Sequence, residues 1–90
     1  MAGTINGTVT ATTWIDLSGT HSLVSNQEYV ISNTGDSDIE MREVATLPAV
    51  ADEGHPVPAG DTWSFTQDDT LEMYIIARGG TTRYTITEAS

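Results

Sequence analysis

The sequence contains no cysteine. Disulfide bonds and zinc sites built on thiolates are therefore excluded. A chain of 90 residues forms one small domain, and the single core of such a domain is only marginally stabilising. Small domains are commonly reinforced by disulfides, by a metal or by oligomerisation. With disulfides excluded, we expect this chain to associate with other copies of itself or with a larger partner.

Basic residues are scarce. Lysine is absent and arginine occurs three times, against thirteen Asp and Glu, so the formal net charge is −10. Nucleic-acid binding needs basic patches that displace counterions from phosphate, and anionic membrane surfaces also attract basic segments. We therefore expect neither nucleic acid nor membrane among the partners. The acids are expected to form a solvated face that keeps the protein soluble and can complement a basic partner surface.

Long hydrophobic runs are also missing. The longest, MYIIA (73–77), has the length of a strand and not of a membrane span. The N-terminal stretch MAGTINGTVTATTW has neither the basic nor the apolar region of a secretory signal peptide. The sequence thus predicts a protein that is made and folded in a cytoplasm.

Threonine is abundant, with fifteen occurrences, and it accompanies valine, isoleucine and aromatic residues in the apolar stretches. Branched side chains favour strands, and turn signals such as Gly79-Gly80 separate these stretches. The sequence predicts one all-β domain over residues 1–90, a small antiparallel β-sandwich or barrel of six to seven strands. Beyond two hairpins, the strands expected are 12–17 and 62–67, with a weaker strand at 4–10 or an extended N-terminal arm over 1–11.

Two hairpins are predicted. The first joins 71–78 to 81–89 through Gly79-Gly80, which supplies the positive φ angles of a two-residue loop. The second joins 27–33 to 37–44 through a three-residue loop. The register of the first pairs Arg78 with Thr81, Ile75 with Tyr84 and Met73 with Ile86, and that of the second pairs Ile31 with Ile39, Tyr29 with Met41 and Glu28 with Arg42.

The outer face of the first hairpin is a candidate interface. The register turns Tyr74 and Ile76 outward beside Arg78 and Arg83, and an exposed apolar spot next to arginines is typical of a contact surface. Trp63 and Tyr84 fall on the predicted core side, so packing is their expected role.

The stretch 46–60 is predicted to be a crossover without regular structure. Pro48 disfavours a helix, and Pro56 and Pro58 extend the residues before them. Val57 to Gly60 fits a type I turn, with proline second and glycine fourth. A long irregular segment usually has a task, so His55, Pro56 and Val57 join the candidate interface.

No catalytic or metal-binding pattern is found. His21 and His55 are isolated, no G-x-S-x-G elbow occurs, and zinc ligands at short paired spacings are missing. The acidic pairs lack the spacing of a calcium loop and suit turns instead. We expect a protein without enzymatic activity, cofactor or metal.

Five short motifs follow one another from Trp14 to Ala89: W-x-D-L, I-S-N-T-G, G-H-P-V-P-A-G-D-T-W, A-R-G-G-T and I-T-E-A. In this order they resemble small virion proteins of tailed bacteriophages, which share an N-T-G turn, a G-H-x-x-x-P-G-[ED] bend and a terminal T-E-A. The chain departs from that pattern at Pro58-Ala59-Gly60-Asp61, where a direct Pro-Gly pair is commoner.

The resemblance implies a structural β-protein without catalytic residues. It would be a decoration or cement protein that binds the major capsid protein on the outer surface of the phage head, often as a trimer, after assembly in the host cytoplasm. The alternative is a receptor- or carbohydrate-binding module of a tail or fibre. That module would need a row of exposed aromatic residues, of which the sequence offers Tyr74.

Overall fold

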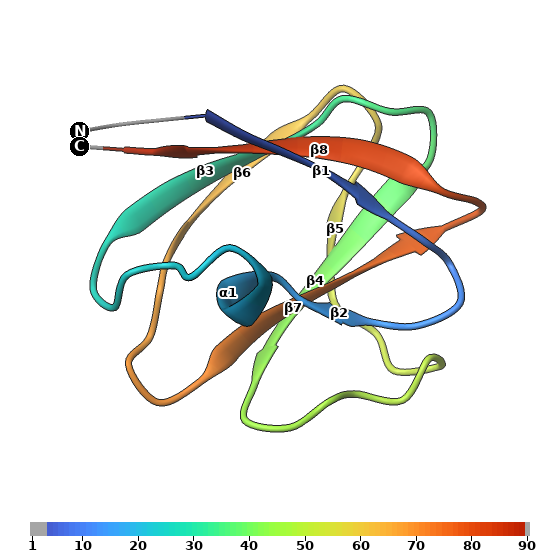
Figure 1. Ribbon diagram of the computed structural model, residues 1–90. Helices are drawn as coiled ribbons and strands as arrows, with labels where there is room; N and C mark the ends of the chain where they lie inside the picture. The colour runs from blue at the N-terminus through green and yellow to red at the C-terminus, as the bar shows by residue number, and fades with distance from the viewer. Residues whose placement is uncertain (1–3, 90) are drawn as a thin grey trace.

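The computed structural model describes residues 4–89 and consists of two four-stranded antiparallel sheets packed face to face (Figure 1). Sheet A has the order β1 (Thr4–Val9), β8 (Thr82–Glu88), β3 (Glu28–Asn33), β6 (Thr62–Thr66). Sheet B has the order β2 (Ile15–Asp16), β7 (Glu72–Arg78), β4 (Asp38–Val44), β5 (His55–Val57). The predicted all-β sandwich is confirmed, with eight described strands where six or seven were expected.

The inner faces of both sheets form one core. Both sheets and α1 contribute fully buried residues to it, among them Val9, Leu17, Ile31, Ile39, Val57, Ile75, Ala77 and Ile86. The alternation of buried and exposed residues in β3, β4 and β8 is the period of two that a half-buried strand requires. In the described part of the chain, no helix has the length and hydropathy needed to cross a membrane.

Both predicted hairpins are wrong. β7 pairs with β4 and β2 in sheet B, whereas β8 pairs with β1 and β3 in sheet A. Likewise β3 pairs with β8 and β6, and β4 with β7 and β5. Strands on either side of Gly79-Gly80 therefore face each other across the core. Apolar alternation predicts which side chains point inward, but it does so equally for strands that pair and for strands in opposite sheets.

The N-terminal segment contributes a strand and a short helix. Residues 4–9 form β1, an edge strand paired with β8, so they belong to the sheet and not to a free arm. Residues 1–3 of the predicted arm lie outside the described residues. The predicted strand 12–17 is reduced to β2, which runs into α1 (Leu17–Thr20). Asp16 caps this helix, since its carboxylate accepts a 2.8 Å hydrogen bond from the amide of Gly19.

The crossover contains a strand that the sequence did not predict. β5 pairs with β4 at the edge of sheet B, and Pro56 lies opposite Glu40. An edge strand tolerates proline because one side of it donates no ladder hydrogen bonds. The predicted turn is one residue out of place: Asp61 N donates to Pro58 O at 2.9 Å, and Gly60, in third position, has φ +87°.

Candidate interaction surfaces

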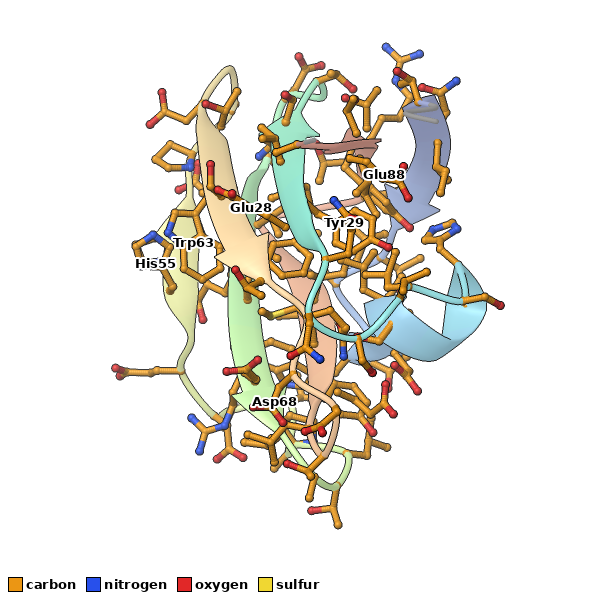
Figure 2. The ribbon with its side chains drawn as sticks, turned by 90° about the vertical axis from the view of Figure 1, so that its left-hand side faces the viewer. Glu28, Tyr29, His55, Trp63, Asp68 and Glu88 are labelled. Carbon is orange, nitrogen blue, oxygen red and sulfur yellow. The ribbon has the colours of Figure 1, made fainter. Side chains whose placement is uncertain are left out.

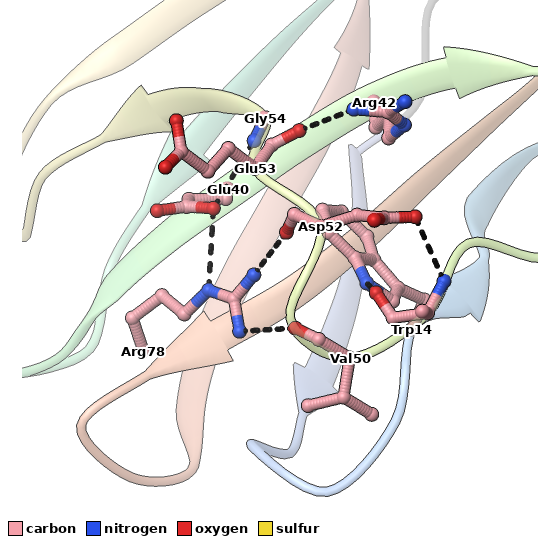
Figure 3. Close-up of polar contacts among 9 residues, drawn as sticks. Trp14, Glu40, Arg42, Val50, Asp52, Glu53, Gly54 and Arg78 are labelled. Carbon is pink, nitrogen blue, oxygen red and sulfur yellow. Dashed lines mark hydrogen bonds and ion pairs between the residues drawn. The ribbon is translucent and has the colours of Figure 1, made fainter.

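Tyr74 and Ile76 are not exposed, so this part of the candidate interface is wrong. Their exposed fractions are 8% and 0%, and they pack with Trp14 and Val44 in a second, smaller core cluster. This cluster lies on the outer face of sheet B, away from the main core. Residues 45–54, the covering loop, run back from the end of β4 over that face, where Trp14 and Arg78 bind its carbonyls (Figure 3).

Arg78 holds the covering loop in place. Its Nη1 donates to the carbonyl of Val50 at 2.7 Å, its Nη2 to the carbonyl of Asp52 at 2.5 Å, and its Nε pairs with Glu40 Oε1 at 3.2 Å (Figure 3). The guanidinium carbon also lies 5.4 Å from the centre of the Trp14 ring. Arg78 was predicted to face a partner, but its donors are used inside the molecule.

Further side chains hold the same loop. Trp14 Nε1 donates to the carbonyl of Ala49 at 2.7 Å, and the amide of Ala49 donates to the carboxylate of Asp52 at 3.0 Å. Arg42 Nη1 donates to the carbonyl of Glu53 at 2.6 Å. The carbonyls along one side of the loop are therefore fixed, and a single backbone path is favoured.

The N-terminal part of the covering loop presents apolar side chains to solvent. Leu47 is 61% exposed and Val50 is 44% exposed. We call residues 45–51, with the sequence ATLPAVA, the apolar segment; it contains no charged residue. The predicted crossover 46–60 contains Leu47 and Val50, but neither residue was among the predicted contact residues. The run ATLPAVA itself, without charge in a strongly acidic chain, was the feature of the sequence that could have identified these two residues as exposed contact residues.

The outer face of sheet A is a second surface without net formal charge, which we call the hydroxyl face. Strand pairing brings together Thr4 with Thr87, Asn6 with Thr85, and Ser32 with Thr62. The whole face consists of Thr4, Asn6, Thr8, Glu28, Val30, Ser32, Thr62, Ser64, Thr66, Arg83, Thr85 and Thr87. Its charges, Glu28 and Arg83, cancel formally. Arg83 is exposed here, as predicted, but it lies on the opposite side of the sandwich from Arg78.

The candidate residues of β5 divide between surface and core. His55 and Pro56 are exposed, but Val57 is buried in the main core at 1% exposure, so it offers no contact surface. β5 and β6 are edge strands of different sheets that lie side by side (Figure 2). The rings of His55 and Trp63 stack across this flank with centroids 4.2 Å apart and planes at 21°. His55 thus covers a tryptophan.

Asn33 joins two of the short sequence motifs. Its amide Nδ2 donates to the carbonyls of Ser37 at 2.7 Å and Val57 at 2.9 Å, and its Oδ1 accepts from Gly35 N and Thr82 Oγ1. Its main-chain groups bond to the bend at residues 60–61. The side chain is 1% exposed, so the N-T-G and G-H-P-V-P-A-G-D motifs meet at a buried structural centre.

His21 serves a structural contact as well. Its Nε2 lies 2.8 Å from the hydroxyl of Tyr84, and the two rings meet edge to face. Burial lowers the pKa of His21 and raises the pKa of Tyr84. Gly7 provides the room for this tyrosine, because a Cβ at Gly7 would lie 2.3 Å from its hydroxyl.

Two shallow grooves flank this pair. One, of about 360 Å³, is polar and is lined by Asn6, Gly7, Thr8, Thr34, Arg83 and Tyr84. The other, of about 230 Å³, is lined mainly by Ile5, His21, Leu23, Val24, Tyr29 and Ile86. Within residues 4–89, no group of three or more His, Asp or Glu side chains is placed to hold a metal ion.

Comparison with protein-family models and with curated proteins finds no match to this chain.

Proposed function

We propose that this chain is a virion structural protein without enzymatic activity. In this proposal it is a decoration or cement protein on the outer surface of a phage head, where it stabilises contacts between major capsid subunits. The resemblance of the motifs from Trp14 to Ala89 supports the virion assignment. Two of these motifs, I-S-N-T-G and G-H-P-V-P-A-G-D-T-W, meet at the buried Asn33, so that part of the similarity concerns the framework of the sandwich.

The observation that carries the proposal is the distribution of charge. The protein has a formal net charge of −10, yet the hydroxyl face is formally neutral and the apolar segment is uncharged. Cores of protein interfaces are depleted in charged residues. These two surfaces lie on opposite sides of the sandwich, since one is the outer face of sheet A and the other lies over sheet B. A protein with two opposed contact surfaces can link two neighbours.

The size of the molecule agrees with this role. Its principal extents are 33 × 27 × 18 Å, so one broad face is large enough to bury the ~800 Å² per partner that a specific interface needs. Contacts of this kind would also add stability to a small core without disulfides. Self-association as a trimer is part of the proposal.

The carbohydrate-binding alternative has lost its main support. It depended on Tyr74 as an exposed aromatic platform, and Tyr74 is buried in a cluster with Trp14 and Ile76. Trp63, the aromatic residue that is partly exposed, is covered on one face by His55. No contact in the described structure favours a sugar over a protein, so we do not propose this function.

Co-sedimentation tests the proposal. Heads that lack this chain, assembled from the major capsid protein of the same virus, are mixed with the purified protein and pelleted. We expect the wild type to pellet with the heads and to saturate. Thr85→Glu, in the middle of the hydroxyl face between Asn6 and Ser32, should reduce the bound amount, because it gives the formally neutral face a net negative charge.

Thr20→Glu is the matched control, since Thr20 is exposed at the end of α1 and lies outside both surfaces. Failure of the wild type to bind heads at any concentration overturns the proposed function. Light scattering on the free protein tests the trimer separately: a monomeric mass would contradict it.

A further inference from the structure

The apolar segment combines two properties that seldom occur together in a surface loop. First, it exposes large apolar side chains: within residues 4–89 the exposed large hydrophobic residues are Val24, Leu47 and Val50, and two of these lie in this segment. A cluster of exposed apolar residues marks a contact site more often than a single one does. Second, its C-terminal part, at Ala49 and Val50, is hydrogen-bonded to the sheet.

The contacts that fix the segment come from the sheet beneath it. Trp14 binds the carbonyl of Ala49, and Arg78 binds the carbonyls of Val50 and Asp52 (Figure 3). A loop that is ordered before binding loses less conformational entropy when a partner arrives. The side chain of Val50 is therefore presented by a backbone that these bonds hold, and Leu47 lies two residues before the first bonded carbonyl, that of Ala49.

The charged groups that face solvent around the apolar segment are carboxylates. Asp52 and Glu53 follow it directly in the chain, and Glu72 pairs with Val44 at its start. The nearby arginines, Arg42 and Arg78, have their guanidinium groups on the carbonyls of the covering loop. A partner that approaches the apolar segment therefore meets apolar side chains with carboxylates beside them.

We infer that the apolar segment is the point at which this chain docks onto a major capsid subunit. Leu47 and Val50 enter an apolar socket on that subunit, and lysine or arginine side chains at the edge of the socket face Asp52, Glu53 and Glu72. The inference rests on the proposed function for the identity of the partner. Buried apolar anchors set the lifetime of such a contact, and the surrounding charges set its association rate and its specificity.

Binding to the same heads tests the inference with three variants. Leu47→Ser should weaken binding about tenfold or more, as expected when one large apolar anchor is removed from a socket. Val24→Ser is the matched control: Val24 is 59% exposed but belongs to the groove near His21, so its removal should leave binding unchanged. Both variants should keep the wild-type thermal midpoint, because both side chains are largely in water.

Glu53→Gln tests the basic edge of the socket. Wild-type binding should weaken when the salt concentration rises from about 0.05 to 0.5 M, and this dependence should be smaller for Glu53→Gln. A variant that binds more tightly than the wild type at low salt would refute the basic edge.

The outcomes separate the inference from the proposed function. If the wild type binds heads and Leu47→Ser binds equally well, the docking point is wrong and the decoration role stands. If the wild type does not bind heads, both are overturned.

Discussion

The side-chain amide of Asn33 donates a 2.9 Å hydrogen bond to the main-chain carbonyl of Val57, which lies 24 residues further along the chain. Asn33 ends β3 in sheet A, and Val57 ends β5 in sheet B, so this bond ties the two layers together. The same side chain accepts from the hydroxyl of Thr82 at the start of β8. One buried amide thus fixes the corner where three strands meet.

Asn33→Ala should destabilise the fold strongly. The substitution leaves the buried carbonyl of Val57 and the hydroxyl of Thr82 without their partner, and each unsatisfied buried group costs about 1–3 kcal/mol. We expect the free energy of unfolding in urea to fall by about 3 kcal/mol. Thr34→Ala is the control, since Thr34 is exposed and should shift the value by less than about 0.5 kcal/mol. Equal effects of the two variants would show that Asn33 is not the centre of this corner.

Gly7→Ala should be destabilising because of one neighbour, Tyr84. The added Cβ would lie 2.3 Å from the ring tip of that tyrosine, and overpacking of this kind costs about 1–3 kcal/mol. In a Tyr84→Leu background the same substitution should cost less than about 1 kcal/mol, because the ring tip is gone. Urea unfolding of the four proteins gives the coupling energy. A coupling of zero would mean that the tyrosine does not occupy the space above Gly7.

Arg78→Met should release the covering loop. It removes the hydrogen bonds to the carbonyls of Val50 and Asp52, and it should expose the cluster of Trp14, Tyr74 and Ile76 to water. In a Trp63→Phe background Trp14 is the single tryptophan, and we expect its emission to shift to longer wavelength and to be quenched more by acrylamide. Arg83→Met, on the hydroxyl face, should leave both signals unchanged. Unchanged Trp14 fluorescence in Arg78→Met would show that the loop stays closed without its arginine.

His21 should contribute a pH dependence of a defined sign. Burial lowers its pKa in the folded protein below the ordinary value of 6.5, so the unfolded chain binds a proton that the folded chain does not. The free energy of unfolding should therefore fall as the pH drops below about 6.5, and the fall should end below the folded pKa. His21→Gln removes this contribution while the many carboxylates remain. The difference between the two proteins in thermal midpoint, measured from about pH 7.5 down to about pH 4.5, isolates the effect. A constant difference across that range would contradict the lowered pKa.

The sequence predicted which residues of each strand face the core better than it predicted which strands pair with each other. Ile75, Tyr84, Ile31 and Ile39 were all expected in the core, and all are buried there. The expected pairs Ile75–Tyr84 and Ile31–Ile39 nevertheless bridge two sheets. Side-chain alternation reports only on inward and outward directions, and a short Gly-Gly link allows a chain to turn within a sheet or to cross to the opposite one.

The error at Tyr74 and Ile76 has a different cause. Their direction, away from the main core, was predicted correctly, but their exposure was not. What covers an outward side chain depends on where a distant loop settles, and a local pattern does not report that. Here the covering loop is fixed by Trp14 and Arg78, residues separated by most of the chain. An uncharged run such as ATLPAVA indicates that a segment contacts something, without saying whether it contacts its own fold, a partner or both.

Electron cryomicroscopy of intact virions can locate this chain and so decide whether it is a decoration protein. We expect density of about 33 × 27 × 18 Å on the outer surface of the head, bridging neighbouring major capsid subunits, with the apolar segment seated on one of them. Density for this chain at the tail tip, or virions in which the chain is absent, would contradict it.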